Sequence, residues 1–367
     1  MLFPEFWLLT PFPYSPIFAA LMTLQTTPLQ KLIVHLVGNK NNADPIHLSQ
    51  SSVELNDDLK AILGDSFLSR FKNNHEWYSF SHRSSLQYNE AYNYCRQIFS
   101  NAESFEETSR TIAQHLYEQS THPKIKGGEL YIAYFDALPV ESRMCKAIGL
   151  FKTENKALFL ETEEGDANIG VVLKEGIELT KIDKGCLVID QKTEEGFDVL
   201  VFDNQNRGEE ALYWKEGFLT LAAQKNEYHN TQHLLTLTKQ FITGLLETEM
   251  HIDKAEQVDL LHKSIDYFKT NESFDIDDFQ AKVFIQEDRI DAFRNFGSRY
   301  VGNNDFDLAA QFDISPEAVK KQSRIFKSVI KLDRNFHIYV HGRTDLIEKG
   351  VDGDGRKFYK IYYQDEG

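Results

Sequence analysis

The sequence predicts an α+β protein with a central, mostly antiparallel sheet flanked by helical regions, and a small C-terminal strand pair. Helical periodicity dominates residues 57–119, short β-like runs separated by glycine or charged turns fill residues 129–202, and helical periodicity returns over residues 209–331. The runs lie too close together for β-α-β crossovers, which need a dozen or more residues. Neighbouring strands are therefore expected to be antiparallel.

The first part of the chain is expected to form one strand followed by three helices. Leu29–Val37 is the strand, and a polar turn follows it. The first helix carries leucine, isoleucine and phenylalanine at helical spacing. The three expected helices are Asp57–Lys72, Tyr88–Phe99 and Glu106–Gln119.

Seven short runs in the middle of the chain are expected to be strands of a meander. They are Glu129–Phe135, Ala147–Phe151, Ala157–Leu160, Gly170–Leu173, Gly176–Ile182, Cys186–Asp190 and Phe197–Phe202. This pattern argues against a dinucleotide-binding or P-loop fold, and neither glycine-rich phosphate motif occurs in the sequence.

The last part is expected to be helical and to end in two strands. The helices are Ala211–Ala223, Thr231–Glu247, Asp253–Lys269, Asp277–Phe284 and Arg289–Tyr300. The strands, Phe336–Val340 and Lys357–Tyr363, are expected to flank a glycine-rich loop at Gly350–Gly355. We divide the chain into an α+β domain over residues 22–205, a helical region over 206–315, and a basic helix with a β-hairpin over 316–367.

Residues 1–21 match neither a signal peptide nor a membrane-spanning helix. They contain a single charge, Glu5, and four prolines interrupt the apolar run. A membrane-surface anchor would use a basic face, which this segment lacks. We interpret it as a mis-called start or an extension, and we expect no membrane partner.

The composition of the 367 residues indicates a packed protein with an acidic surface. Apolar residues make up 41% and aromatic residues 13%, which excludes global disorder, while the net charge of −16 excludes a uniformly basic DNA-coating protein. Cys95, Cys145 and Cys186 lie far apart and are expected to be buried thiols in a reducing cytoplasm. No metal site, cofactor or catalytic residue is predicted.

One segment is strongly basic, and it is the predicted contact for DNA phosphates. Residues 320–343 carry seven basic side chains against one acidic one, whereas the first 319 residues carry a net charge of −20. A helix from Pro316 would align four of these side chains at i, i+4, i+7 and i+11. A solvated face, or pairing with acidic helices, is the alternative. The basic residues are Lys320, Lys321, Arg324, Lys327, Lys331, Arg334 and Arg343.

A helix-turn-helix-like stretch precedes the basic segment. Leu308–Val319 has small and apolar residues at plausible offsets, but Asp313 stands in place of the usual turn glycine. Its second helix would begin Pro316-Glu317, which puts a carboxylate where base-reading residues normally lie. We interpret the stretch as a helix pair used for packing, with any DNA contact made mainly to phosphate.

A metal-dependent nuclease is the enzymatic alternative. Glu154-x-Lys156 follows a predicted strand and Asp136 ends an earlier one, which resembles the acid-then-E-x-K pattern of restriction-type nucleases. Similar triplets occur elsewhere in this chain, so the pattern has little specificity. Asp352–Gly355 lacks the ligands of a calcium loop and is expected to be a turn between strands.

Several short sequence segments resemble those of the bacterial nucleoid-associated proteins of the thirty-seven-kilodalton class. In order, they are Gly128–Tyr131, Ala147–Lys152 running into Glu154–Lys156, Lys181–Val188, Ala211–Trp214 and Lys239–Ile242. The C-terminal segment Lys327–Tyr339 resembles a Bacteroidetes-type branch of that family. The resemblance implies a cytoplasmic protein found with the bacterial chromosome, and it transfers no catalytic residue.

The sequence therefore predicts a non-catalytic nucleoid-associated protein that binds DNA, or a DNA-bound assembly, through the local basic strip. Its expected partners are DNA, bound with weak sequence selectivity, and other nucleoid proteins. Formation of a homo-oligomer is possible. Two alternatives remain: the nuclease, and a scaffold whose acidic surface recruits nucleoid proteins.

Overall fold

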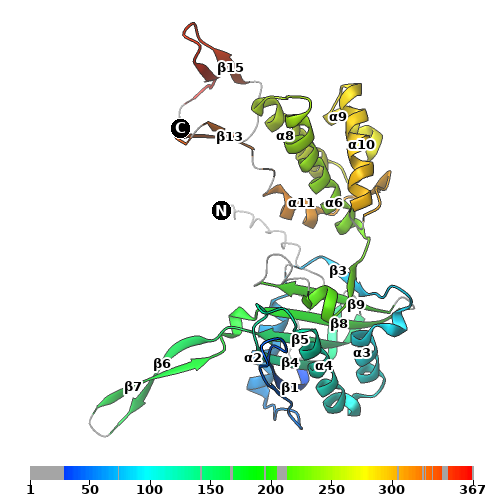
Figure 1. Ribbon diagram of the computed structural model, residues 1–367, viewed down its shortest axis with the longest axis vertical. Coiled ribbons are helices and arrows are strands. Elements are labelled where there is room, and N and C mark those ends of the chain that lie inside the picture. Colours follow the sequence, from blue (N-terminus) through cyan, green and yellow to red (C-terminus); the bar gives the residue numbers. More distant parts are fainter. Residues whose placement is uncertain are drawn as a thin grey trace, which may run out of the picture. The chain divides into compact units, whose positions relative to one another are not determined.

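The computed structural model describes most of the chain, in two compact units. The first unit ends at Gln224 and the second begins at Lys225. The described residues are 29–72, 74–140, 143–165, 168–193, 196–204, 213–303, 306–324, 326, 328–332, 334–340 and 346–365. The segment 1–21 lies outside them. The predicted α+β class is confirmed (Figure 1).

An eight-stranded antiparallel sheet forms the centre of the first unit. Its strands are β1 (Leu29–Val37), β2 (Ile46–His47), β3 (Trp77–Phe80), β4 (Gly128–Val140), β5 (Arg143–Thr153), β8 (Lys184–Thr193), β9 (Gly196–Asp203) and β10 (Leu221–Ala223). Their order is β10-β3-β9-β8-β5-β4-β1-β2, and every neighbouring pair is antiparallel. The predicted meander is confirmed in β4, β5, β8 and β9.

Helices cover both faces of this sheet. On one face lie α3 (Glu90–Ser100), α4 (Phe105–Gln119) and the π-helical turn η4 (Tyr213–Phe218), and on the other lies α2 (Asp57–Ser69). Successive residues of β4 alternate between the two cores, so both sets are apolar. On the α2 side, the rings of Phe67 and Phe151 stack with centroids 4.2 Å apart. The three cysteines are buried, as expected.

The second unit is helical around an aromatic core. Its helices are α6 (Glu227–Gln240), the π-helical turn η5 (Phe241–Leu245), α7 (Leu246–Thr248), α8 (Lys254–Thr270), α9 (Ile276–Val283), α10 (Glu287–Asn303) and α11 (Pro316–Ser323). Two short strands, β11 (Ser273–Asp275) and β12 (Gln311–Asp313), pair beside them. Edge-to-face contacts between phenylalanine rings, such as Phe241 with Phe293, fill the interior.

Two expected elements of the first unit are wrong. Gly176–Ile182 is no strand, because Ser66 and Arg70 of α2 donate hydrogen bonds to carbonyls there and a 3₁₀ turn, η3 (Leu179–Lys181), forms. Within the described residues, the expected helix Ala211–Ala223 is helical only over the π-helical turn Tyr213–Phe218. Thr220 adopts a positive φ of 49°, and the chain then joins the sheet as β10.

The C-terminal region also departs from the prediction. The basic helix ends at Ser323, and two hairpins follow it: β13 (Ser328–Leu332) with β14 (Phe336–Val340), and β15 (Ile347–Val351) with β16 (Lys357–Ile361). The expected partners β14 and β16 therefore do not pair with each other. Asp352–Gly355 is a turn, as predicted, and connects β15 to β16.

The predicted helix pair over Leu308–Val319 is wrong as well. Gln311–Asp313 is the strand β12, paired with β11, so α11 has no helical partner directly before it. Ser315 directly precedes α11, and its side chain accepts a hydrogen bond from the Ala318 amide and caps the helix.

The buried side chain of His35 fastens β1 to α4. The residue is 1% exposed, and its Nδ1 accepts a hydrogen bond from the Ser49 amide at 3.1 Å. Nε2 therefore carries the proton and lies 3.1 Å from the Ser109 hydroxyl oxygen, which accepts it. Burial, aided by the Arg110 guanidinium, lowers the pKa of His35 from 6.5 to about 4.

This pKa predicts a pH-dependent stability. Above pH 6.5 the contribution of neutral His35 is fully present, and it is lost as the pH falls towards 4, because the unfolded chain binds a proton that the folded chain excludes. We expect His35→Asn to flatten the stability curve in this window by up to about 1.4 kcal/mol per pH unit. Urea unfolding at several pH values measures this, and parallel curves for parent and variant would contradict it.

Candidate functional site

The first group of predicted basic residues lies at the C-terminal end of α11. Lys320 and Lys321 are exposed in its last turn, and Arg324 is the exposed residue that caps it. Cations at this end also interact favourably with the helix dipole. The ammonium of Lys321 lies 5.6 Å from the centre of the buried Tyr228 ring.

The second group lies on the β13–β14 hairpin rather than on a helix. Ile330 is buried against Val258 of α8, together with other apolar residues of the hairpin's inner face. Strand alternation therefore places Lys331 on the outer face, opposite His337, and both are exposed. Arg334 is exposed in the turn between the strands.

Aromatic side chains that the sequence analysis missed accompany these cations. Tyr339 lies on the same outer face as Lys331, and Phe336 lies next to the turn. Each is 63% exposed. Two alternating runs around Asp333-Arg334-Asn335 were the signal for this hairpin, but the i, i+4 spacing of lysines suggested a helix instead.

The two groups lie beside different parts of α8. The hollow of about 680 Å³ next to Lys320 is lined by Lys269 and Thr270, at the end of α8, whereas β13 packs near Val258. These positions on α8 are roughly 16 Å apart at 1.5 Å per residue. The predicted helical stripe is thus replaced by two separate basic groups. Lys327 and Arg343 lie outside the described residues.

The nuclease residues are not brought together. In the β4–β5 ladder, Glu129 pairs with Thr153 and Phe135 pairs with Ala147, so Glu154 follows one end of the ladder and Asp136 lies well inside it, at the bulge after Phe135. Six or seven residues of strand separate them by about 20 Å. Within the described ranges, no group of three histidine, cysteine, aspartate or glutamate side chains is placed to hold a metal ion.

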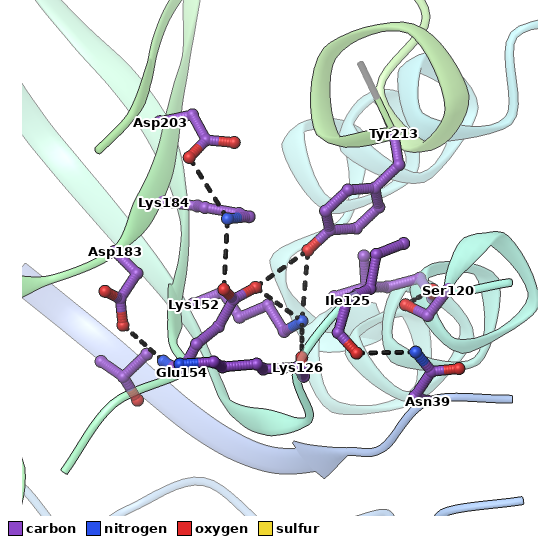
Figure 2. A network of polar contacts seen from close by, with 12 residues as sticks. Asn39, Ser120, Ile125, Lys126, Lys152, Glu154, Asp183, Lys184, Asp203 and Tyr213 are labelled. Atoms are coloured by element: carbon purple, nitrogen blue, oxygen red, sulfur yellow. Dashed lines mark hydrogen bonds and ion pairs between the residues drawn. The ribbon is translucent and has the colours of Figure 1, made fainter. Parts of the chain in front are cut away.

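Glu154 belongs instead to a buried polar network at the end of the sheet (Figure 2). Lys152 and Lys184 are direct neighbours on β5 and β8, and both side chains are fully buried. One oxygen of Glu154 accepts from Lys152 at 3.0 Å, and the other accepts from Lys184 at 3.3 Å. The carboxylate thereby offsets the repulsion between two adjacent ammonium groups.

Further partners complete this network. Asp203 of β9 accepts from Lys184 at 3.2 Å, and the Tyr213 hydroxyl of η4 donates to Glu154 at 3.2 Å. Burial lowers the pKa of Lys152, although the charge of Glu154 opposes that shift. Burial, reinforced by Glu154, raises the pKa of Tyr213 well above its usual value. The network joins three strands to η4.

Lys156, the other nuclease candidate, lies outside this network. Its ammonium pairs with Glu129 at 3.0 Å and is partly exposed. Both side chains line a shallow hollow of about 410 Å³, together with Glu154 and Glu175. Lys156 therefore pairs with Glu129, whereas Glu154 pairs with the two buried lysines.

The network predicts a strong dependence of stability on Glu154. In Glu154→Gln, two buried ammonium groups lose their shared carboxylate, and we expect the free energy of unfolding to fall by about 3–5 kcal/mol. The control is Glu129→Gln, which breaks the partly exposed pair with Lys156 and should cost at most about 1 kcal/mol. Urea unfolding of both variants measures the difference, and equal losses would contradict the interpretation.

The chain was compared with known proteins and protein families. No curated protein matches it at a significant level. No helix among the described residues is long and apolar enough to cross a membrane. A family model described as nucleoid-associated protein YejK (NA37) matches residues 33–354, which is well over half of the chain and includes both units. The chain belongs to the NA37 family of nucleoid-associated proteins.

Proposed function

We propose that this nucleoid-associated protein binds duplex DNA directly and without catalysis, through the basic residues of its second unit. The observation that carries the proposal is the exposure of every described member of the predicted set. These residues are Lys320, Lys321, Arg324, Lys331 and Arg334. Exposed ammonium and guanidinium groups release counterions when they contact phosphates, and this release drives DNA binding.

The hairpin is the strongest contact element in this proposal. A two-stranded β-ribbon fits the major groove of duplex DNA, and Lys331 and Arg334 lie on the outer face and turn of such a ribbon. Tyr339 and Phe336 add exposed aromatic surface for sugar or base contacts. The two basic groups lie beside positions of α8 that are about 16 Å apart, a distance that spans roughly five phosphates of one DNA strand. The α11 group would therefore contact phosphates further along the duplex.

The acidic remainder of the chain limits the contact to this region. The first 319 residues carry a net charge of −20, which repels the phosphate backbone. Contacts to phosphate carry no sequence information by themselves. We therefore expect weak sequence selectivity and a steep dependence of affinity on salt.

The proposal is tested by mobility shift of a duplex at several salt concentrations, with the full chain. We expect binding at low salt that weakens steeply as salt increases. Reversing two charges in Lys331→Glu/Arg334→Glu should weaken binding and reduce the magnitude of the log–log salt slope by about 2, one for each lost phosphate contact.

The control variant carries the same charge change elsewhere in the second unit. Lys263→Glu/Arg299→Glu reverses one exposed lysine of α8 and one exposed arginine of α10, and should keep the parent's slope. Equal losses in both variants would show that only net charge matters. Absence of any shift by the parent at low salt would overturn direct binding.

A further inference from the structure

Among the described residues of the first unit, the β6–β7 ribbon, here called the arm, carries the largest group of exposed large apolar side chains. β6 (Ala157–Glu164) and β7 (Ile169–Gly176) pair in an unbroken antiparallel register. Figure 1 shows the arm projecting from the sheet. At 3.4 Å per residue it is about 27 Å long. An isolated two-stranded ribbon is at best marginally stable in water, so a covering partner would stabilise it.

The register divides the arm into two chemically different faces. Directly paired residues share a face, and successive residues alternate. The aliphatic face presents five large side chains, each 62–69% exposed: Leu158, Leu160, Ile169, Val171 and Leu173. The polar face presents Phe159, Glu161, Glu163, Val172 and Lys174.

The charges of the arm identify the kind of partner that the aliphatic face fits. Lys174 pairs with Glu161 on the polar face. Glu164 and Glu175 lie only at the two ends of the aliphatic face, whose centre is uncharged. With four carboxylates against one ammonium, the described arm would repel DNA. The uncharged centre calls for an equally uncharged, flat surface.

We propose that the aliphatic face of the arm packs against the same face of a second copy of this chain. Sheet faces pack on sheet faces about 10 Å apart, and an isologous contact needs only one self-complementary patch. Such packing buries the five aliphatic side chains and leaves both polar faces in water. One face of a two-stranded ribbon is smaller than the roughly 800 Å² per partner that a stable complex buries, so we expect the association to be reversible.

Sedimentation velocity of the full chain over a concentration series tests this proposal without DNA. The parent is expected to form dimers as concentration rises, and Leu160→Glu/Val171→Glu to remain monomeric. The matched control is Val172→Glu, an apolar-to-acidic change on the opposite face of the same strand, which should dimerise like the parent. A parent that stays monomeric, or variants that all associate alike, would overturn the proposal.

Cross-linking gives a second measurement that does not depend on the acidic variants. The native cysteines are buried, so a thiol placed on the arm is the reactive one. Thr162→Cys lies near the centre of the aliphatic face and should be joined to its copy by a bismaleimide that spans about 10 Å. Val172→Cys, on the opposite face of the arm, should not be cross-linked to its copy. Equal cross-linking of both, or of neither, would contradict the arm-to-arm contact, and neither result bears on the DNA assay.

Discussion

Burial of both faces of the eight-stranded sheet is the constraint on which the first unit depends. Helix α2 covers one face, and α3, α4 and η4 cover the other, so consecutive residues of the central strands must all be apolar. Ile132 and Ala133 illustrate this, because each is fully buried in a different core. A sheet of this kind has no solvated face on which polar groups could be placed, and every polar side chain inside it needs a partner within the protein.

That requirement explains the network at the end of the sheet. Lys152 and Lys184 lie side by side in the ladder without access to water, and the carboxylates of Glu154 and Asp203 supply the opposing charge. Replacing a whole buried ion pair by apolar residues is often neutral for stability, whereas removing one partner is costly. Here the arrangement ties β5, β8 and β9 to Tyr213 of η4. The Glu154 carboxylate is committed to these contacts, which is why a nuclease-like spacing in the sequence does not become a nuclease-like site.

The arm and the β13–β14 hairpin both expose large side chains, and their surfaces differ in kind. The arm exposes aliphatic side chains on one face and a mixed set with two carboxylates and one ammonium group on the other. The β13–β14 hairpin buries Ile330 and exposes Lys331 and the Tyr339 ring on its outer face. The first composition suits a protein surface and the second suits a polyanion. The proposed contacts with a second copy and with DNA thus use separate elements in separate units, and two linked DNA-binding regions would bind a long duplex more tightly than one.

The sequence by itself determined the α+β class, the meander, most helices and the concentration of positive charge near the C-terminus, because hydrophobic periodicity and charge are local properties of the chain. Tertiary structure decided the elements whose local signals were ambiguous. Lys327 and Lys331 have the i, i+4 spacing of a helix. Ser328–Leu332 is nevertheless a strand, because it pairs with β14 and buries Ile330 against Val258. Likewise, only the ladder register shows that Asp136 and Glu154 are far apart and that Lys152 adjoins Lys184. Contacts between residues distant in sequence depend on packing of the whole sheet, which no local pattern encodes.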